Sequence, residues 1–518
     1  MSAMDFDAHA VRAIESIKDG KNVFITGKAG TGKSTLLRYC RDNFLKSAVV
    51  LAPTGVAALN VQGQTIHRFF GFGIAVSPNL VRKNRIGPRG FKKHLFKKLK
   101  TIIIDEISMV RADLLDCVDI FLRKHGPNPR KPFGGVQMVF FGDLFQLSPV
   151  VRNDEKGLFP DVYESPYFFS STVIGKSELE VIELESIYRQ SDQAFKNLLD
   201  KIRNSEARTN DLEVLDRRID RNFEAPEGEF FITLTATNAN AEHINEAKLR
   251  ALPGDERVSR ASITGKVEKD SFPTAEILRF KIGSQIMMLN NDTEGRWVNG
   301  SVGELTSIAK GDDGNLVVKA QLRDNDELVS VERHSWDVIE FVMQNGEIVP
   351  KEVGVFEQLP FRLAWAVTIH KCQGLTFDKV VVDLDRVFGF GQAYVALSRC
   401  TAIEGIILSR SIGEESIRTD YRVQKFFADR KIALANKRRP VSEKLEQIRN
   451  AIESGVDLEI LYLKGNNTES RHVVSPIEVG DLDYKGVVYQ GMRARCSKAD
   501  AVLNFNVNRI IEMESAGT

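Results

Sequence analysis

Short apolar runs rich in β-branched and aromatic residues recur through the N-terminal part of the chain. The runs at 22–26, 48–52, 101–104 and 136–141 are apolar at most positions. A strand covered on both faces has this composition, because neither set of alternating side chains meets water. We therefore predict buried strands of a parallel sheet here, with a helix at 35–44 after the first of them.

Farther along the chain the pattern changes to short alternating segments. Those at 305–308, 316–322 and 327–331 are separated by turns rich in glycine and aspartate. This spacing predicts a small β-barrel inserted at 300–358. An insert with a purely structural role is the alternative.

The C-terminal part shows a third pattern. The basic segment at 434–441 contains a helix-breaking proline and predicts a linker. Leu445, Ile448 and Ile452 then share one face of a predicted helix that begins at Ser442 and ends at Gly455. Four strand-like runs follow, at 458–463, 472–479, 487–492 and 502–510. Together they are enough for a separate β-rich domain at 442–518.

Composition narrows the class of protein. The chain has 518 residues, 42% hydrophobic and 27% charged, as in a soluble globular protein with three or four domains of about 150 residues. No stretch approaches the roughly 20 apolar residues that cross a bilayer, and the N-terminus lacks the layout of a secretory signal. The five cysteines lie far apart without a CxxC pair, which argues against a disulfide framework or a zinc site. We expect a cytoplasmic protein with no membrane partner.

The net charge of +1 says nothing about a polyanionic partner, but the charges are unevenly distributed. No acidic residue lies between Phe72 and Ile104, where nine basic residues gather. They are Arg82, Lys83, Arg85, Arg89, Lys92, Lys93, Lys97, Lys98 and Lys100. Such a patch is typical of a surface that holds phosphates. A solvated basic face is an equal alternative.

Residues 27–34, GKAGTGKS, match the pattern GxxxxGK[ST] in full and follow a predicted strand. In this context the loop's N–H groups cradle phosphates, the lysine reaches the β- and γ-phosphates and the hydroxyl binds Mg²⁺. The helix that follows adds the partial positive charge of its N-terminus. A chance glycine-rich turn is the alternative, but both flanking elements are those the motif requires. The predicted nucleotide-binding residues here are Gly27, Ala29, Gly30, Thr31, Gly32, Lys33, Ser34 and Thr35.

Asp105 and Glu106 directly follow the predicted strand at 101–104. Beside a phosphate loop, Asp105 is placed to hold Mg²⁺ and Glu106 to polarise the attacking water. The loop and this pair predict nucleoside triphosphate hydrolysis, with ATP and Mg²⁺ as cofactors. Gln146 follows the run at 136–141 and can sense the γ-phosphate through hydrogen bonds; a plain turn residue is its alternative.

Phosphoryl transfer usually needs positive charge from outside the loop, and an arginine finger can be worth roughly 10³–10⁵ in rate. Arg189 and Arg399 are the candidates, the latter at the end of a small-residue segment at 391–400. An ordinary ion pair is the alternative for either arginine.

The order of these motifs resembles that of the Pif-type helicases of superfamily one, relatives of the RecD helicases. The matching segments are GKAGTGKS, APTGVAALN, TIHRFF, IIIDEISM, GDLFQLSPV, LESIYRQ, LTATNANAEHIN, AVTIHKCQGLTFD and GQAYVALSRC. The segment DLLDCVDIFLRKHGPNPRKPFGG at 113–135 is similar to a signature of the same family. The resemblance covers residues 20–430.

The resemblance implies an α/β fold with two RecA-like P-loop domains, at 1–170 and 171–433, with ATP between them. It also implies a 5′→3′ DNA helicase that translocates on single-stranded DNA. It assigns Arg189 and Arg399 as γ-phosphate ligands and Gln146 as the sensor, and it adds Tyr188 and Gly374 to the nucleotide-binding residues. The glutamine with which family members recognise adenine is missing at 5–10, so base selectivity stays open.

Polar residues after further predicted strands are candidates for DNA contact, because open α/β sheets bind ligands at strand ends. Hydroxyls and amides suit phosphates, and an aromatic ring can stack on an unpaired base. By resemblance the DNA-binding residues are Pro53, Thr54, Gly55, Thr65, His67, Phe69, Asn238, Thr368, His370 and Lys371. For the two histidines, a packed position without a ligand is the alternative.

The family inserts a small wedge where the basic stretch lies, at 70–100. We therefore predict that Lys92, Lys93, Lys97 and Lys98 hold duplex phosphates at the strand-separation fork. The predicted barrel resembles the Src-homology-3-like insert of related helicases.

The C-terminal pattern resembles a WYL domain, a class associated with nucleic-acid or ligand sensing. Its arginines predict an anion-binding cluster, with solvated surface arginines as the alternative: Arg471, Arg493, Arg495 and Arg509.

Three functions compete. The first is a DNA helicase, the second a DNA-stimulated ATPase that remodels bound proteins without opening duplexes, and the third a ligand-sensing regulator with a vestigial motor. The complete ATP motifs argue against the third, and the basic stretch, interpreted as a wedge, favours the first. The expected partners are single-stranded DNA and DNA forks, with G-quadruplexes and RNA–DNA hybrids as further candidates. We expect a monomer, associated with the nucleoid of a bacterium.

Overall fold

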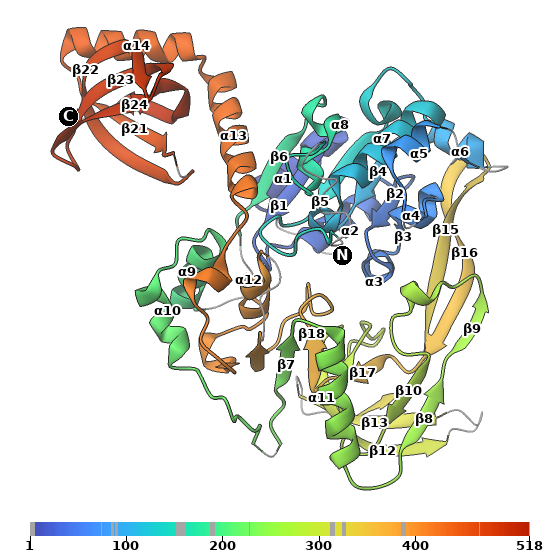
Figure 1. Ribbon diagram of the computed structural model, residues 1–518. Coiled ribbons are helices and arrows are strands. Elements are labelled where there is room, and N and C mark those ends of the chain that lie inside the picture. Colours follow the sequence, from blue (N-terminus) through green and yellow to red (C-terminus); the bar gives the residue numbers. More distant parts are fainter. Residues whose placement is uncertain are drawn as a thin grey trace. The chain divides into compact units, whose positions relative to one another are not determined.

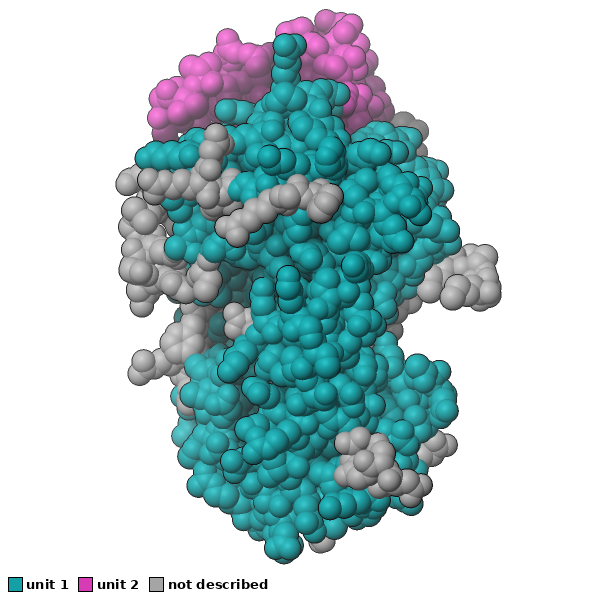
Figure 2. All heavy atoms as spheres, turned by 90° about the vertical axis from the view of Figure 1, so that its right-hand side faces the viewer, with its two compact units in different colours: residues 1–419 teal, residues 420–518 magenta. Residues whose placement is uncertain are grey.

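The computed structural model describes residues 6–73, 75–83, 87–88, 92–151, 162–186, 192–226, 228–310, 316–323, 328–384, 390–465 and 467–516. The chain divides into two compact units, 1–419 and 420–518 (Figure 2). This boundary lies earlier than the linker expected at 434–441, because helix α13, Tyr421–Arg438, runs through most of that segment.

The first lobe of the larger unit is built on a six-stranded sheet (Figure 1). Its order is β3-β2-β4-β5-β1-β6, and every pairing is parallel. The strands are β1 (Val23–Gly27), β2 (Val49–Ala52), β3 (Gln64–Thr65), β4 (Thr101–Ile104), β5 (Gln137–Phe141) and β6 (Glu180–Leu184). The four apolar runs of the sequence are confirmed as strands. The expected boundary at 170 is too early, since β6 pairs with β1.

Helices cover this sheet, with apolar side chains packed beneath them. The longer ones are α1 (Ala8–Lys18), α2 (Lys33–Asn43) and α7 (Ala112–His125). The shorter ones are α3 (Gly55–Asn60), α4 (Ile66–Phe70), α5 (Pro78–Arg82), α6 (Lys92–Lys98) and α8 (Thr172–Gly175). The predicted helix at 35–44 is α2, which begins two residues earlier, at Lys33.

The segment at 113–135 closes on itself. Asp119, on α7, accepts the backbone N–H of Phe133 at 2.6 Å and also pairs with Arg123. Phe133 and Gly134 both have left-handed backbone, with φ of 51° and 63°. A Cβ on Gly134 would lie 2.2 Å from the carbonyl oxygen of Leu122, so this tight return to β5 requires glycine.

The second lobe contains a four-stranded parallel sheet, in the order β18-β7-β19-β20. Its strands are β7 (Ile232–Thr235), β18 (Ala366–Thr368), β19 (Val380–Asp383) and β20 (Ile406–Leu408). Its helices are α9 (Gln193–Arg203), α10 (Thr209–Asp216), α11 (Asn238–Ala251) and α12 (Gln392–Leu397). One apolar cluster joins α9, α10 and α12 to these strands.

The β-rich part of this unit differs from the single insert expected at 300–358. A five-stranded antiparallel sheet has the order β14-β13-β12-β11-β17 and so begins before residue 300 and ends after 358. Its strands are β11 (Gln285–Met288), β12 (Val302–Lys310), β13 (Leu316–Leu322), β14 (Leu328–Val331) and β17 (Phe361–Leu363). Alternation marks strands but not their pairing, which is why the bounds were missed.

A long hairpin within the expected insert belongs to another sheet. It consists of β15 (His334–Gln344) and β16 (Glu347–Gln358), and it pairs with β9 (Ser262–Gly265). A two-stranded sheet of β8 (Arg257–Arg260) and β10 (Ile277–Phe280) accompanies it. The hairpin reaches α6 (Figure 1), where Lys92 pairs with Glu340.

The smaller unit combines α13 and α14 (Val441–Ser454) with an antiparallel sheet ordered β24-β23-β22-β21-β25. The strands are β21 (Leu458–Leu463), β22 (Glu469–Tyr484), β23 (Val487–Cys496), β24 (Ala501–Asn506) and β25 (Ile510–Ser515). The single strand predicted at 502–510 is wrong, because a 3₁₀ turn at Val507–Arg509 divides it into β24 and β25. Helix α14 begins at Val441, so the N-cap is Pro440 and not Ser442.

Three of the four arginines predicted as an anion-binding cluster form ion pairs or hydrogen bonds within this unit. Arg471 pairs with Glu459 and Glu512, and Arg493 pairs with Glu478. Arg509 donates to the carbonyl oxygens of residues 463 and 464. This mixed-charge surface argues against the cluster.

Among the described residues, no helix combines the length and apolar character needed to cross a membrane. The five cysteines are buried.

Candidate nucleotide-binding site

The phosphate loop connects β1 to α2 at the carboxyl edge of the first sheet. Gly27, Gly30 and Gly32 have φ of 151°, 83° and 80°, values that glycine adopts without strain. A Cβ on Gly27 would lie 2.7 Å from the carbonyl oxygen of Leu184. The Lys33 ammonium donates to the carbonyl oxygens of Gly27 and Lys28 at 2.7 and 2.9 Å. The glycine conformations and the Lys33 ammonium together define the shape of the loop between β1 and α2.

A cavity of about 700 Å³ opens at this loop. One wall consists of the loop and the start of α2, residues 29–36, which include the predicted nucleotide-binding residues from Ala29 to Thr35. Glu106 and Gln146 add side chains from the same lobe. Gly374, Thr376 and Arg399 line the cavity from the second lobe. The structure thus brings these predicted residues together between the two lobes.

Two carboxylates end the neighbouring strand β4. The Glu106 N–H donates to the Asp105 carboxylate at 3.0 Å, and Glu106 has a left-handed φ of 51°. Burial raises the pKa of both carboxyl groups, and the adjacent Asp105 charge raises the pKa of Glu106 further. A raised pKa makes Glu106 a stronger base than an exposed glutamate, which suits proton removal from water.

Gln146 belongs to a chain of side-chain hydrogen bonds with a defined direction. Its Nε2 donates to the Asp143 carboxylate at 3.2 Å, and its Oε1 accepts from Gln373 Nε2, also at 3.2 Å. The same Gln373 nitrogen donates to Glu106 Oε2 at 2.8 Å. The Asp143 carboxylate only accepts, so it fixes the Gln146 amide nitrogen on its side. The Gln146 oxygen then requires the amide nitrogen of Gln373, so both amides can face just one way. Gln146 therefore turns its carbonyl oxygen toward Glu106.

Arg399 follows α12 and is 1% exposed. Its guanidinium donates to the carbonyl oxygens of Val395 and Leu375 and to the Ser398 hydroxyl. Burial lowers its pKa, against the opposing effect of nearby acidic groups that include Glu106. The arginine is thus held in the part of the cavity wall that the second lobe supplies. Arg189 and Tyr188 lie outside the described residues.

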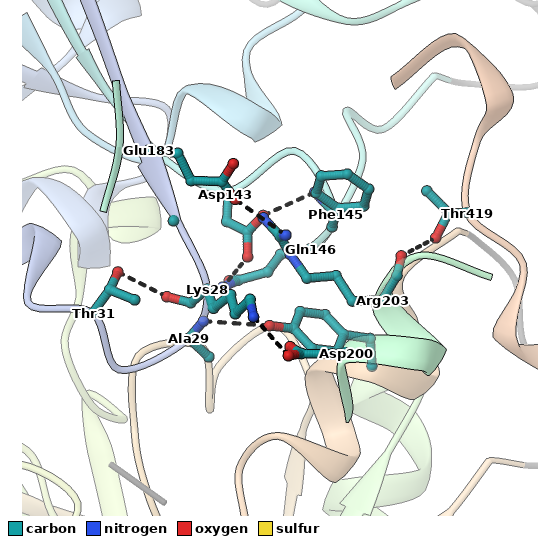
Figure 3. A network of polar contacts seen from close by, with 12 residues as sticks. Lys28, Ala29, Thr31, Asp143, Phe145, Gln146, Glu183, Asp200, Arg203 and Thr419 are labelled. Atoms are coloured by element: carbon teal, nitrogen blue, oxygen red, sulfur yellow. Dashed lines mark hydrogen bonds and ion pairs between the residues drawn. The ribbon is translucent and has the colours of Figure 1, made fainter. Parts of the chain in front are cut away.

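Two further contacts join the lobes beside the loop (Figure 3). Lys28 forms an ion pair with Asp200 of α9 at 2.6 Å. The Ala29 N–H donates to the Tyr394 hydroxyl of α12 at 3.3 Å. Neither contact was predicted. Lys28 and Tyr394 lie within motif segments that could have indicated them, whereas Asp200 carries no local signal.

The other end of the cavity is lined by Phe6, Asp7, Ala10 and Leu184. The Asp7 carboxylate caps α1 by accepting the Ala10 N–H at 2.8 Å. Three of these four lining residues are apolar.

The residues predicted to contact DNA lie at the carboxyl ends of strands in both sheets. Pro53, Thr54 and Gly55 follow β2, and Thr65 ends the adjacent strand β3, opposite Ala52. In the second lobe, Asn238 begins the helix after β7, and Thr368 ends β18 beside it. His370 and Lys371 follow directly and are exposed. The hydroxyls of Thr54 and Thr65 each cap the next helix.

Phe69 is a correction to the prediction. It is 4% exposed and packs against Phe70, Phe96 and Phe341. Its ring closes an apolar cluster between α4, α6 and the β15–β16 hairpin, so it is not available to stack on a base. His67, next to it in α4, is half-buried, and burial lowers its pKa.

Three of the four lysines predicted to hold duplex phosphates have partners within the protein. Lys92 pairs with Glu340, Lys97 donates to the carbonyl oxygen of Gly126, and Lys98 donates to that of Gly346. No partner is found for Lys93 among the residues that the structure describes. Arg85 and Arg89 lie outside the described residues. The predicted phosphate contacts are therefore reduced to fewer side chains than the composition suggested.

The chain matches known proteins over this site and both lobes. The model of the PIF1-like helicase family matches residues 7–212. The ATP-dependent DNA helicase PIF1 of Danio rerio is 35% identical over 408 residues and covers 76% of this chain. The ATP-dependent DNA helicase Pif1 of Bdellovibrio bacteriovorus is 32% identical over 423 residues, which cover 80% of this chain and 90% of that protein. The match spans only 59% of the Danio rerio protein.

Solved structures give the same result. The crystal structure of Bacteroides sp Pif1 in complex with ADP-AlF4 aligns with a TM-score of 0.75 at 35% identity, over 82% of this chain and 96% of that one. Bacteroides Pif1 bound to single-stranded DNA aligns with a TM-score of 0.58 at the same identity. Matches of this identity, extending over nearly the whole length of a bacterial relative, establish that this chain belongs to the PIF1-like helicase family.

Proposed function

We propose that this chain is an ATP-dependent DNA helicase that moves 5′→3′ along single-stranded DNA and separates duplex or other structured DNA. The observation that carries the proposal is the composition of the cavity wall. Lys33 and Glu106 come from one lobe and Arg399 from the other, so hydrolysis of a bound triphosphate changes the contacts between the lobes. A cycle of such changes is what a two-lobed motor needs to move along a strand.

The proposed roles follow from these positions. Lys33 binds the β- and γ-phosphates, with N–H groups of the loop around them. Glu106 accepts a proton from the attacking water, and Gln146 orients that water through its carbonyl oxygen. Arg399 stabilises the charge that develops on the γ-phosphate, together with Arg189, which the family resemblance assigns to the same role.

Mg²⁺ fits the available donors. The Ser34 hydroxyl and the Asp105 carboxylate are oxygen ligands of the kind that Mg²⁺ takes together with phosphate oxygens and water. We propose that these two residues hold it. The ion neutralises charge on the β- and γ-phosphates when it is bound.

For DNA, we propose a path over the carboxyl ends of β2 and β3 in the first lobe and of β7 and β18 in the second. Thr54, Thr65, Asn238, Thr368, His370 and Lys371 supply hydroxyl, amide and basic groups along it. The residues of the nucleotide site follow the carboxyl ends of β1, β4 and β5, at the same edge of the first sheet. Nucleotide and DNA therefore contact neighbouring loops, through which each can influence the other.

We further propose that the smaller unit is a WYL-like accessory domain that modulates the motor. In the larger unit, we propose that the sheet β14-β13-β12-β11-β17 corresponds to the Src-homology-3-like insert. Deleting residues 442–518 tests the first of these proposals. Unchanged unwinding and DNA affinity after the deletion would refute it.

The decisive test of function uses two fluorescent partial duplexes, one with a 5′ tail and one with a 3′ tail, with ATP and Mg²⁺. The expected result is opening of the 5′-tailed duplex alone, and no opening by Lys33→Ala. If neither duplex opens while DNA still stimulates hydrolysis, the protein is a translocase that remodels bound proteins instead.

A further inference from the structure

Arg203, the last residue of α9, is a buried cation that no motif accounts for. Its side chain is 5% exposed and forms ion pairs with Asp143 and Glu183, each at 3.3 Å. The guanidinium also lies over the Phe145 ring, 4.0 Å from its centroid. Although burial lowers the arginine's pKa, the two carboxylates raise it by more, so it stays charged. Both partners belong to the first lobe, whereas α9 packs in the core of the second.

Asp143 connects this cation to the nucleotide site. Its side chain is fully buried. One carboxylate oxygen accepts from Arg203 and from the Phe145 N–H, and the other accepts from Gln146 Nε2. In Figure 3, Arg203 reaches toward Asp143 and Gln146, which lie together beside the phosphate loop. A buried carboxylate is stable only with such partners, because its desolvation is costly.

We propose that Arg203 is a positioning residue for ATP hydrolysis, acting through Asp143 to set the direction of the Gln146 amide. Because Asp143 holds the Gln146 Nε2, the Gln146 Oε1 points away from Asp143. This oxygen and a Glu106 carboxylate oxygen both accept from the Gln373 amide nitrogen, so they lie close together. Two acceptors then face the same region, which is the arrangement that orients a water molecule by both its protons.

Because Arg203 belongs to the second lobe, the orientation of the Gln146 amide depends on how the two lobes lie against each other. The Asp143 contact exists only while α9 lies against the first lobe. Asp200, one turn earlier on α9, ties the same helix to Lys28 of the phosphate loop. The helix therefore couples the apposition of the lobes to the orientation of Gln146. A triphosphate bound while the lobes are apart is hydrolysed slowly, which favours hydrolysis in the closed state.

This inference rests on the proposed ATPase function, and the experiment separates the two. It compares the full-length protein with Arg203→Met, Arg203→Lys, Asp143→Asn and the double variant Arg203→Met/Asp143→Asn. Lys201→Met is the matched control. Lys201 lies on the same helix, but its ammonium is exposed and pairs with Asp211 of the second lobe. The measurements are kcat and KM for ATP with single-stranded DNA, affinity for a fluorescent ADP, and the midpoint of thermal unfolding.

We expect Arg203→Met to lower kcat by about 10- to 100-fold, the range for a misplaced catalytic group. Its affinity for the ADP analogue should stay within about threefold, because ADP lacks the phosphate that Gln146 faces. Arg203→Lys should recover only part of the rate, since a lysine does not reproduce the guanidinium fork. Lys201→Met should match the wild type.

The double variant distinguishes positioning from simple stabilisation. It removes both buried charges, so the midpoint of unfolding should return toward that of the wild type. The rate should stay low, because an asparagine at 143 can offer either nitrogen or oxygen and no longer dictates the Gln146 amide. Recovery of kcat together with stability would overturn the proposal, as would a single Arg203→Met variant with wild-type kcat. A wild-type protein without DNA-stimulated hydrolysis would instead refute the proposed function itself.

Discussion

Gln373 donates a hydrogen bond to the Glu106 carboxylate at 2.8 Å, although the two residues lie on different lobes and 267 positions apart. The same amide nitrogen reaches Gln146 Oε1. A side chain of the second lobe thus orients two side chains of the first, at the point where water attack is proposed. This contact makes Gln373 part of the proposed hydrolytic site.

Replacing Gln373 with alanine should therefore lower kcat for ATP by about tenfold, since loss of orientation at a catalytic group has effects of this order. Gln373→Glu should lower kcat further, because it replaces the donor nitrogen with a carboxylate oxygen beside two acceptors, the Glu106 carboxylate and the Gln146 carbonyl oxygen. The exposed Gln344→Ala serves as the control. Steady-state hydrolysis with single-stranded DNA measures the effect, and a change of less than twofold in Gln373→Ala would contradict this role.

Lys93 should account for more of the salt dependence of DNA binding than Lys92. Lys92 is paired with Glu340, whereas Lys93 is exposed. If Lys93 contacts one duplex phosphate, Lys93→Gln should lower the slope of log K against log salt by about 0.9.

Lys92→Gln should leave that slope nearly unchanged. Fluorescence anisotropy with a forked DNA at several salt concentrations measures both slopes. Equal slopes for Lys93→Gln and the wild type would remove Lys93 from the proposed wedge surface.

Gly134→Ala should destabilise the first lobe. The residue has a φ of 63°, and a Cβ there would lie 2.2 Å from a backbone oxygen. We expect a loss of at least roughly 1–3 kcal/mol in the free energy of unfolding, the range for a strained backbone. Gly175→Ala, where a Cβ meets open space, is the control and should change stability by less than about 0.5 kcal/mol. The free energy of unfolding of each variant is measured by denaturant unfolding with a probe in the first lobe. Similar losses for the two substitutions would contradict the claim that the Gly134 backbone requires glycine.

Lys444 predicts a pH dependence in the smaller unit. It is 1% exposed and donates to Asn436 Oδ1 and to the carbonyl oxygen of Ile510. Burial, with a smaller effect of the Arg439 charge, lowers its pKa from 10.5 to about 8. Between these values the unfolded chain binds a proton that the folded unit does not, so stability rises with pH, by at most about 1.4 kcal/mol per pH unit.

Lys444→Met lacks this titration, so the stability of the variant relative to the wild type should fall as the pH rises from about 8 to 10.5. Hydrogen exchange of the β21 and β25 amides in the two full-length proteins, compared at each pH, measures the difference. A difference that does not change with pH would show that Lys444 keeps an ordinary pKa.

The sequence by itself determined the elements whose information is local. The strands β1, β2, β4 and β5 are short runs that are apolar at most positions, and the phosphate loop is one uninterrupted segment, so neither depends on a distant partner. Local patterns also failed in a consistent way. Apolar and polar residues alternate along most of the run at 502–510 and mark no break in it. The turn that divides the run depends on the Asn506 side chain, which accepts the Asn508 N–H at 3.0 Å.

Tertiary structure decided what depends on contacts between distant residues. Phe69 looks suited to base stacking until Phe96 and Phe341 bury it, and Lys92 looks available to DNA until Glu340 pairs with it. Arg203 and Gln373 gain their importance only when the two lobes meet around Asp143 and Glu106. The physical reason is the same in each case. A motif specifies a backbone and its side chains, but burial and the pairing of charges are properties of the space between segments.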